Sequence, residues 1–102
     1  MKNFDGVHAL VPTPLTKKTE IDTDSLRNVI DFELENGCVG VGVLAAIGEG
    51  YLVSNEDWQN VVKTAIDHTN SRGYVNVGCA SMGTKQAVDL ARAAEDMGED
   101  AV

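Results

Sequence analysis

Long apolar runs and clustered basic residues are both scarce in this sequence of 102 residues. The longest apolar stretch, from Val39 to Ile47, is interrupted by Gly40 and Gly42 and is far too short to span a bilayer. The sequence has eight basic and 16 acidic residues, and every basic residue is isolated along the chain except the pair Lys17-Lys18. We therefore expect a cytoplasmic protein that has no nucleic-acid or membrane partner.

The numbers of cysteines, prolines and glycines also exclude whole classes of protein. Cys38 and Cys79 lie far apart, with no CxxC pair and no histidine at metal-ligand spacing, so neither a zinc site nor a disulfide framework is expected. Both cysteines are predicted to be small buried residues. Ten glycines and two prolines indicate neither a fibrous repeat nor disorder. The sequence suggests no metal and no organic cofactor.

Short apolar runs predict strands. The first, from Val7 to Val11, ends at Pro12-Thr13-Pro14, where two prolines remove backbone donors. The second, from Cys38 to Leu44, is apolar on both of its alternating faces, which is typical of a parallel strand buried on both sides. A third strand is predicted from Tyr74 to Cys79, and Ala101-Val102 has the character of a fourth strand's opening.

Helical periodicity separates these runs. A first helix is predicted to begin after Asp22 and to end before Gly37. A second helix is predicted to begin at Ser54, which with Asp57 approximates a capping box. This second helix is expected to end near Arg72-Gly73. Thr84 is predicted to cap a third helix that ends at Gly98. Its inward face would comprise Ala87, Leu90, Ala91, Ala94 and Met97.

Strand and helix alternate strictly, and the strands start near residues 7, 39, 74 and 101. That spacing matches the roughly 31 residues per unit of a (β/α)8 barrel of about 250 residues. A doubly wound sheet also alternates in this way, so the pattern favours the barrel only slightly. We predict an α/β chain in which residues 1–102 form about three and a half β-α units at the N-terminal end of a single TIM-barrel domain.

Two glycine-containing segments could carry chemistry. Gly40 to Ala45 matches the G-x-G-x-x-A dinucleotide pattern, but its glycines fall inside a strand and no helix opens there, so we expect them to leave room for neighbouring side chains. The segment Ala45 to Gly50 follows that strand at the end where barrel active sites lie. The glycines beside Glu49 would allow a positive φ and a close approach of backbone amides to a ligand, or would simply form a turn in which Glu49 caps or pairs locally.

Isolated aromatic and histidine residues have mostly structural interpretations. His8 is predicted to line the interior of the barrel rather than act as a general base. His68 is predicted to be a solvated residue that interacts with a helix C-terminus. Trp58 and Tyr74 are predicted to anchor the packing, and Tyr51 to have a packing role as well.

Four ordered motifs together resemble the dihydrodipicolinate synthase / N-acetylneuraminate lyase family. Gly6 leads into Ala9-Leu10-Val11-Pro12-Thr13-Pro14, which is similar to the family's A-x-x-x-T-P, and an acidic stretch follows at Glu20-Ile21-Asp22. Gly48-Glu49 with Val53-Ser54-Asn55-Glu56 resembles the family's G-T-T-G-E and S-x-x-E elements. The C-terminal Gly98-Glu99-Asp100-Ala101-Val102 resembles its G-A-D-A-V.

This resemblance implies a (β/α)8 lyase or aldolase that works as a homodimer or homotetramer. It implies a lysine Schiff base with a 2-oxo acid such as pyruvate, whose protonated imine lets a carbanion form at the adjacent carbon. The lysine and an assisting tyrosine are expected beyond Val102, so no catalytic residue lies in this segment, which alone would be inactive. The implied substrate-binding residues are Thr13, Ala46, Ile47, Gly48 and Glu49.

The sequence departs from the family where two threonines are expected. Ala46 and Ile47 stand there, and neither can donate a hydrogen bond to a substrate carboxylate or relay a proton. Lysine-pathway synthase activity remains one expectation, and a sugar-acid lyase or dehydratase is the alternative. A different alternative is a non-catalytic half-barrel that assembles with copies of itself, because open sheet edges favour pairing with another chain.

Overall fold

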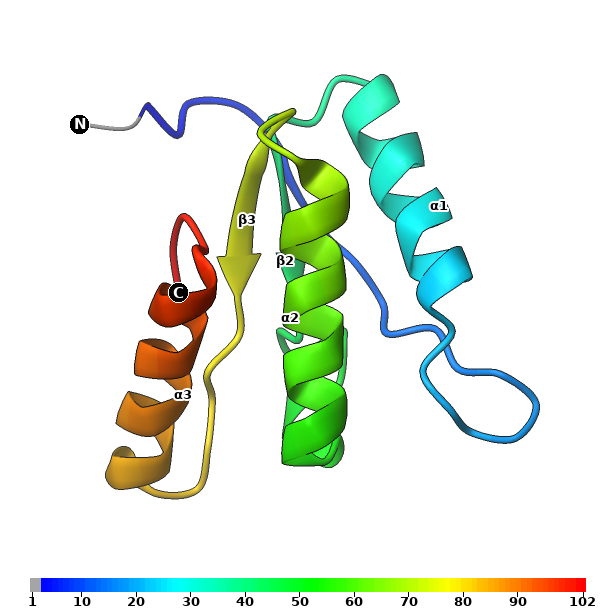
Figure 1. The fold of residues 1–102 in the computed structure, drawn as a ribbon. Coiled ribbons are helices and arrows are strands. Elements are labelled where there is room, and N and C mark those ends of the chain that lie inside the picture. The colour runs from blue at the N-terminus through cyan, green and yellow to red at the C-terminus, as the bar shows by residue number, and fades with distance from the viewer. Residues whose placement is uncertain (1–2) are drawn as a thin grey trace.

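A computed structural model describes residues 3–102 (Figure 1). Strands and helices alternate along the chain, as predicted. In chain order the elements are β1 (His8–Leu10), α1 (Thr23–Glu35), β2 (Gly40–Val43), the short 3-10 helix η1 (Gly50–Leu52), α2 (Asn55–Thr69), β3 (Tyr74–Val77) and α3 (Thr84–Met97).

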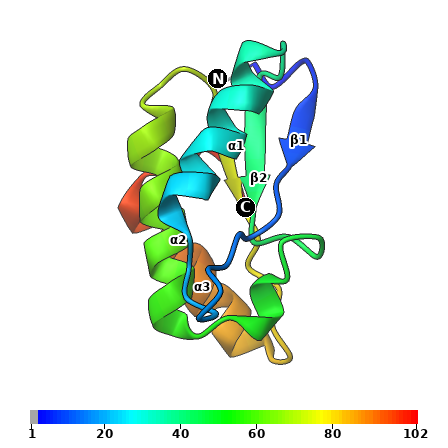
Figure 2. The ribbon, with the colours of Figure 1, turned by 90° about the vertical axis from the view of Figure 1, so that its right-hand side faces the viewer.

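The three strands form one parallel sheet in the order β1-β2-β3. β1 and β2 are in register at Ala9 and Val41, and Val41 pairs in turn with Val75 of β3. Ala101 forms a parallel bridge with Asn76, so the predicted opening of a fourth strand is confirmed. Figure 2 shows α1 and α2 on one side of β1 and β2, and within residues 3–102 no α-helix covers the other face of these two strands.

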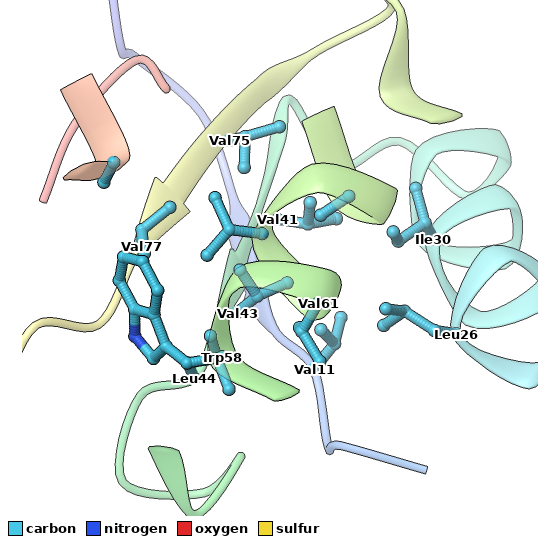
Figure 3. Close-up of a cluster of buried hydrophobic side chains, with 13 residues drawn as sticks. Val11, Leu26, Ile30, Val41, Val43, Leu44, Trp58, Val61, Val75 and Val77 are labelled. Atoms are coloured by element: carbon cyan, nitrogen blue, oxygen red, sulfur yellow. The ribbon is translucent and has the colours of Figure 1, made fainter. Parts of the chain in front are cut away.

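The core lies between the sheet and the helices. Side chains at alternate strand positions point toward the helices and are buried, because successive strand residues face opposite sides of the sheet. Figure 3 shows Val41, Val43, Val75 and Val77 from the strands gathered near Val61 of α2. The buried cluster is completed by Val11, Leu26, Ile30, Leu44, Trp58, Val62, Ala65 and Ala94.

The opposite face of the sheet carries the residues that would line a barrel interior. A Cβ added to Gly40 would lie 2.6 Å from His8 Nδ1, and one added to Gly42 would lie 2.7 Å from Leu10 Cδ2. Both glycines therefore make room for neighbouring side chains, as predicted. His8 also occupies this face, where its Nδ1 lies 3.0 Å from Asn76 Nδ2 and its Nε2 lies 2.8 Å from the carbonyl oxygen of Phe4.

Two of the predicted helix starts are confirmed and one is wrong. The Asp22 carboxylate accepts from the Ser25 backbone N–H (3.0 Å) and hydroxyl (2.8 Å), and these bonds hold the pKa of Asp22 below its usual value. Ser54 Oγ accepts from the Asp57 N–H at 3.1 Å, which is one half of the predicted capping box. Thr84 is not a cap: the N-cap of α3 is the extended Gly83, and Thr84 is already helical.

Burial differs from the prediction at several positions. Cys38 and Cys79 are half-buried free thiols rather than buried ones, and Tyr51 is 65% exposed rather than packed. On the inward face of α3 only Ala94 is fully buried. α2 ends at Thr69, before the predicted Arg72-Gly73, because Asn70 takes a left-handed conformation at its C-cap.

An ionic cluster joins α1 to the end of α2. His68 Nε2 and Arg72 Nη2 each lie 2.8 Å from the same oxygen of Asp31. His68 is thus half-buried and bonded to another helix rather than solvated, so that prediction is wrong. Arg72 and then His68 hold the pKa of Asp31 below its usual value by hydrogen bonding.

Asp31→Asn is expected to lower the thermal midpoint at pH 7, because a carboxylate favoured in the folded state stabilises that state wherever it is ionised. The folded-state pKa is depressed, so this stabilisation is present above the unfolded pKa of about 3.9 and is lost as pH falls through the folded value. Melting curves between pH 7 and pH 2 should show the two proteins converge at the acid end. A matched control is Asp24→Asn, whose partner Arg27 is bound at an exposed site and should matter less. A gap that stays constant down to pH 2 would contradict this assignment.

Within residues 3–102, no helix has the length and apolar character needed to cross a membrane.

Candidate functional site

The candidate site lies at the C-terminal ends of the three parallel strands. The chain leaves β1 at Val11, β2 at Leu44 and β3 at Gly78, and backbone hydrogen bonds tie both outer strand ends to the last residues of β2. Val11 N–H donates to the Gly42 carbonyl (2.9 Å), and Gly78 N–H donates to the Val43 carbonyl (2.8 Å). The loops that follow therefore emerge side by side, at the edge where parallel α/β proteins bind ligands.

Two glycines approach the backbone carbonyl group of Leu44 closely at this edge. Leu44 has φ 60°, an uncommon conformation for a branched residue, and its side chain is buried. A Cβ on Gly50 or on Gly78 would overlap the Leu44 carbonyl oxygen. The two glycines thus permit close backbone approach, whereas the positive φ values in this loop belong to Leu44 and Glu49 and not, as predicted, to the glycines beside Glu49.

The loop after β2 is a tight turn anchored to the loop after β1. Glu49 N–H donates to the Ala46 carbonyl at 3.1 Å, which closes the turn. Gly48 is buried within it, and its carbonyl accepts a hydrogen bond from the Thr13 hydroxyl. Two of the predicted site segments, 13 and 46–49, are therefore in direct contact.

Backbone donors are the hydrogen-bonding groups that this turn offers to a ligand. Within residues 3–102, the N–H groups of Ala46, Ile47 and Gly48 have no hydrogen-bond acceptor. The side chains of Ala46 and Ile47 are exposed and carry no polar atom. A carboxylate could accept from such successive amides, as anions do in backbone concavities.

Glu49 closes the loop and begins η1. Its conformation is left-handed (φ 54°, ψ 37°), and its carbonyl accepts from the Leu52 N–H at 2.9 Å. The side chain makes no capping hydrogen bond to η1, so the local capping interpretation is not supported. Glu49 places an exposed carboxylate next to the turn.

Trp58 contacts this edge from the core side of the sheet. Its side chain is 3% exposed and packs with Val77 and Leu44 in the core, as predicted for a packing anchor (Figure 3). Its indole N–H also donates to the Gly78 carbonyl at 3.1 Å. Sequence reasoning missed this bond, because the donor and acceptor are 20 residues apart and no motif links them.

Leu10 is a further residue that the sequence analysis did not select. It is the last residue of β1, lies on the face opposite the helices and is 56% exposed. Its alternation with buried Val11 is the signal that could have indicated an inward-facing site residue.

Cys79, just past β3, is not an activated nucleophile. Burial and then the charge of Glu99 raise the pKa of its thiol, which keeps it protonated near neutral pH. No group of three or more His, Cys, Asp or Glu side chains in the described part of the chain is arranged to hold a metal ion.

Comparison with known proteins identifies the family. A sequence model of the Dihydrodipicolinate synthetase family matches residues 3–102. The chain belongs to this family. The 4-hydroxy-tetrahydrodipicolinate synthase of Methanocaldococcus jannaschii is 37% identical over 99 residues, which are 97% of this chain and 34% of that protein. The chain thus spans about a third of the length of the curated relatives that it matches.

Solved structures from the family have the same fold. A dihydrodipicolinate synthase that is 36% identical superposes with a TM-score of 0.90, over 95% of this chain and 33% of that one. A chloride-inhibited dihydrodipicolinate synthase of Acinetobacter baumannii, complexed with pyruvate, is 28% identical with a TM-score of 0.92, over 97% of this chain and 34% of its own. The predicted resemblance and the predicted N-terminal β-α units of a TIM barrel are both confirmed.

Proposed function

We propose that this protein is a lyase or aldolase that forms or cleaves a C–C bond through a lysine Schiff base with a 2-oxo acid. In this proposal residues 1–102 are the N-terminal part of a single TIM-barrel domain. The lysine and an assisting tyrosine lie outside these residues. Residues 3–102 contribute the carboxylate-binding edge, formed by Thr13, Ala46, Ile47, Gly48 and Glu49.

The unpaired amides of the turn after β2 carry this proposal. A 2-oxo acid has a carboxylate beside its reactive carbonyl, and the N–H groups of Ile47 and Gly48 can bind that carboxylate. Binding at the strand ends would place the keto carbon over the barrel interior, where an amine from a later strand could reach it. The pyruvate complexed with the Acinetobacter baumannii synthase supports a 2-oxo acid of this kind.

Ala46 and Ile47 bear on which substrate is used. Where the family resemblance implies two threonine hydroxyls, these side chains offer none. Without compensation, losing a hydrogen bond to a charged group weakens binding by about ten- to a hundredfold. We therefore propose 2-oxo acid chemistry in general, with lysine-pathway synthesis as one possibility and sugar-acid cleavage or dehydration as the alternative.

The test measures the intact mass of the natural gene product after incubation with pyruvate and borohydride. Borohydride reduces a lysine imine to a stable secondary amine, so one adduct per chain of the mass of reduced pyruvate is expected. Borohydride without pyruvate is the control. Folded protein that gives no adduct with pyruvate or with longer sugar-derived 2-oxo acids would refute the Schiff-base proposal.

Thr13→Val is expected to weaken 2-oxo acid binding. Valine has the shape of threonine but cannot donate to the Gly48 carbonyl, so the turn loses its tie to the β1 loop. A neutral hydrogen bond contributes about 0.5–1.5 kcal/mol, which predicts a KM for pyruvate roughly two- to tenfold higher. Thr13→Ser keeps the hydroxyl and should stay near the wild-type KM. Equal KM values for all three proteins would remove Thr13 from the site.

The other candidate is a non-catalytic half-barrel, and the open inward face of the sheet favours it. Leu10 is half-exposed on that face, and a second copy could cover it. Light scattering on the encoded protein measures the number of chains per particle. A discrete oligomer of 102-residue chains that gives no adduct would favour the half-barrel. A homodimer or homotetramer that does form the adduct would favour the enzyme.

A further inference from the structure

The connection from α1 to β2 contains a pair of residues that can react with each other. Asn36 and Gly37 form the only Asn-Gly pair in the sequence. Asn36 is the C-cap of α1, Gly37 follows it with φ 99°, and both residues are exposed. Because the pair precedes β2, it lies at the N-terminal edge of the sheet, away from the candidate site (Figure 1).

An asparagine followed by glycine permits an intramolecular reaction. The backbone nitrogen of Gly37 can attack Cγ of the Asn36 side chain, because glycine carries no Cβ beside that nitrogen. A C–N bond forms, the Gly37 nitrogen gives up its proton, and the side-chain nitrogen leaves as ammonia, so that a cyclic imide results. Water then breaks one of the imide C–N bonds and leaves aspartate in a normal or an isoaspartyl linkage. The sum converts an amide and water to a carboxylic acid and ammonia, without an oxidant or reductant.

The local restraints on this reaction lie in the last turn of α1. Asn36 Nδ2 donates to the Phe32 carbonyl at 2.7 Å, and the Gly37 N–H donates to the Leu34 carbonyl at a long 3.3 Å. Both bonds are at an exposed helix end, and such ends fray at little cost in free energy. Within residues 3–102, no atom lies within 4 Å of the position that a Cβ on Gly37 would occupy. Attack therefore requires only a local opening and leaves the sheet intact.

Negative charge weakens this helix end further. Residues 32–35 contain no basic side chain, whereas Glu33 and Glu35 place carboxylates at the helix C-terminus, where the macrodipole is already negative. Glu33 Oε2 accepts from the Cys38 thiol at 3.6 Å, so one of these carboxylates lies beside the connection itself. A carboxylate at position 36 would add to this charge and would deprive the Phe32 carbonyl of its side-chain donor.

We propose that Asn36 is a site of spontaneous deamidation, at which water replaces the side-chain amide by a carboxylate through an imide with Gly37. This modification is independent of the proposed function. The aspartyl product loosens the end of α1, and the isoaspartyl product also inserts one backbone carbon shortly before Val39. Val39 ties the start of β2 into the sheet, because its N–H donates to the Val7 carbonyl (2.8 Å) and its carbonyl accepts from the Tyr74 N–H (2.9 Å). The protein therefore loses stability as it ages.

The test follows the natural gene product during incubation at mildly alkaline pH, where base removes the Gly37 amide proton. Trypsin cleaves after Arg27 and Lys63 and releases residues 28–63, a peptide that carries Asn36 together with two controls, Asn28 in α1 and Asn60 in α2. Fragmentation mass spectrometry should show replacement of NH2 by OH at residue 36 at least about tenfold faster than at either control, because the controls react only when a helix interior opens. Equal rates, or no change at residue 36, would overturn the proposal.

Two variants separate the reaction from its consequence. Asn36→Gln keeps a side-chain amide but needs a larger ring, so it should stay unmodified at residue 36 and keep its own initial thermal midpoint through the same incubation. Asn36→Asp reproduces the aspartyl product and should melt below the fresh wild type at neutral pH. A mass change in Asn36→Gln as fast as that in the wild type would rule out the imide route through Gly37. A wild-type midpoint for Asn36→Asp would rule out the predicted loss of stability.

Discussion

Gly78→Ala is expected to be among the most damaging single-methyl changes in this chain. The added Cβ would overlap the Leu44 carbonyl oxygen, which belongs to the backbone and cannot move aside by a rotamer change. Overpacking of this kind costs about 1–3 kcal/mol of unfolding free energy, and more where the backbone must shift. Because Leu44 begins the turn that contains Gly48, pyruvate adduct formation should slow as well. Urea denaturation and the rate of borohydride trapping measure the two effects.

Gly83→Ala is the matched control for this prediction. Gly83 has an ordinary extended conformation, and no atom lies within 4 Å of the position that its Cβ would occupy. Because Gly83 is the N-cap of α3, where alanine is less favourable than glycine, the variant's unfolding free energy should fall by at most about 1 kcal/mol, and pyruvate adduct formation should keep its rate. If Gly78→Ala were as stable and as reactive as Gly83→Ala, the close approach of Leu44 to Gly78 would not exist in solution.

Trp58→Ala is expected to lower the unfolding free energy by about 3–5 kcal/mol, because truncating a buried aromatic side chain leaves a cavity that the surroundings fill only partly. The indole lies between the sheet and α2 and is 3% exposed. A loss of this size is a large fraction of the roughly 5–15 kcal/mol that stabilises a typical domain. Phe32→Ala, which removes an aromatic ring that is 61% exposed, should cost within about 0.5 kcal/mol.

Trp58→Phe separates the hydrogen bond from the packing. Phenylalanine keeps most of the apolar surface but leaves the Gly78 carbonyl without its indole donor. The expected cost is about 1–3 kcal/mol, the usual range for a buried polar group that loses its partner. If Trp58→Phe were as stable as the wild type, the indole hydrogen bond would have no net effect on stability. If it lost as much unfolding free energy as Trp58→Ala, packing of the aromatic ring would make no separate contribution.

The hydrophobic pattern predicted the elements because periodicity is a local property. A run in 38–44 that is apolar on both faces predicted a strand buried on both sides, and β2 lies in the middle of the sheet. The Asp22 and Ser54 caps were predictable because each side chain bonds to a backbone amide three residues ahead. Thr84 was predicted wrongly, because a glycine can also occupy the N-cap position and sequence alone does not choose between neighbours.

Contacts between distant segments could not be predicted. His68 is a plausible solvated residue on its own helix, but packing of α1 against α2 brings Asp31 to it from 37 positions away. The burial of the cysteines and of Tyr51 depends likewise on which elements cover them. Positive φ was expected at glycines, yet Leu44, whose side chain is buried, and Glu49, whose backbone bonds to Ala46 and Leu52, adopt it instead.

By itself, the sequence determined that this chain alternates parallel strands and helices, that Gly40 and Gly42 leave room on the inward face, and that residues 46–49 follow the second strand at the C-terminal edge of the sheet. These features follow from side-chain size, polarity and spacing along the chain. Tertiary structure alone decided that the Thr13 hydroxyl anchors the Gly48 carbonyl, that Leu44 packs against two glycines, and that Trp58 bonds to Gly78. Each joins segments that meet only after the sheet forms, so its energy depends on the folded geometry and not on local sequence.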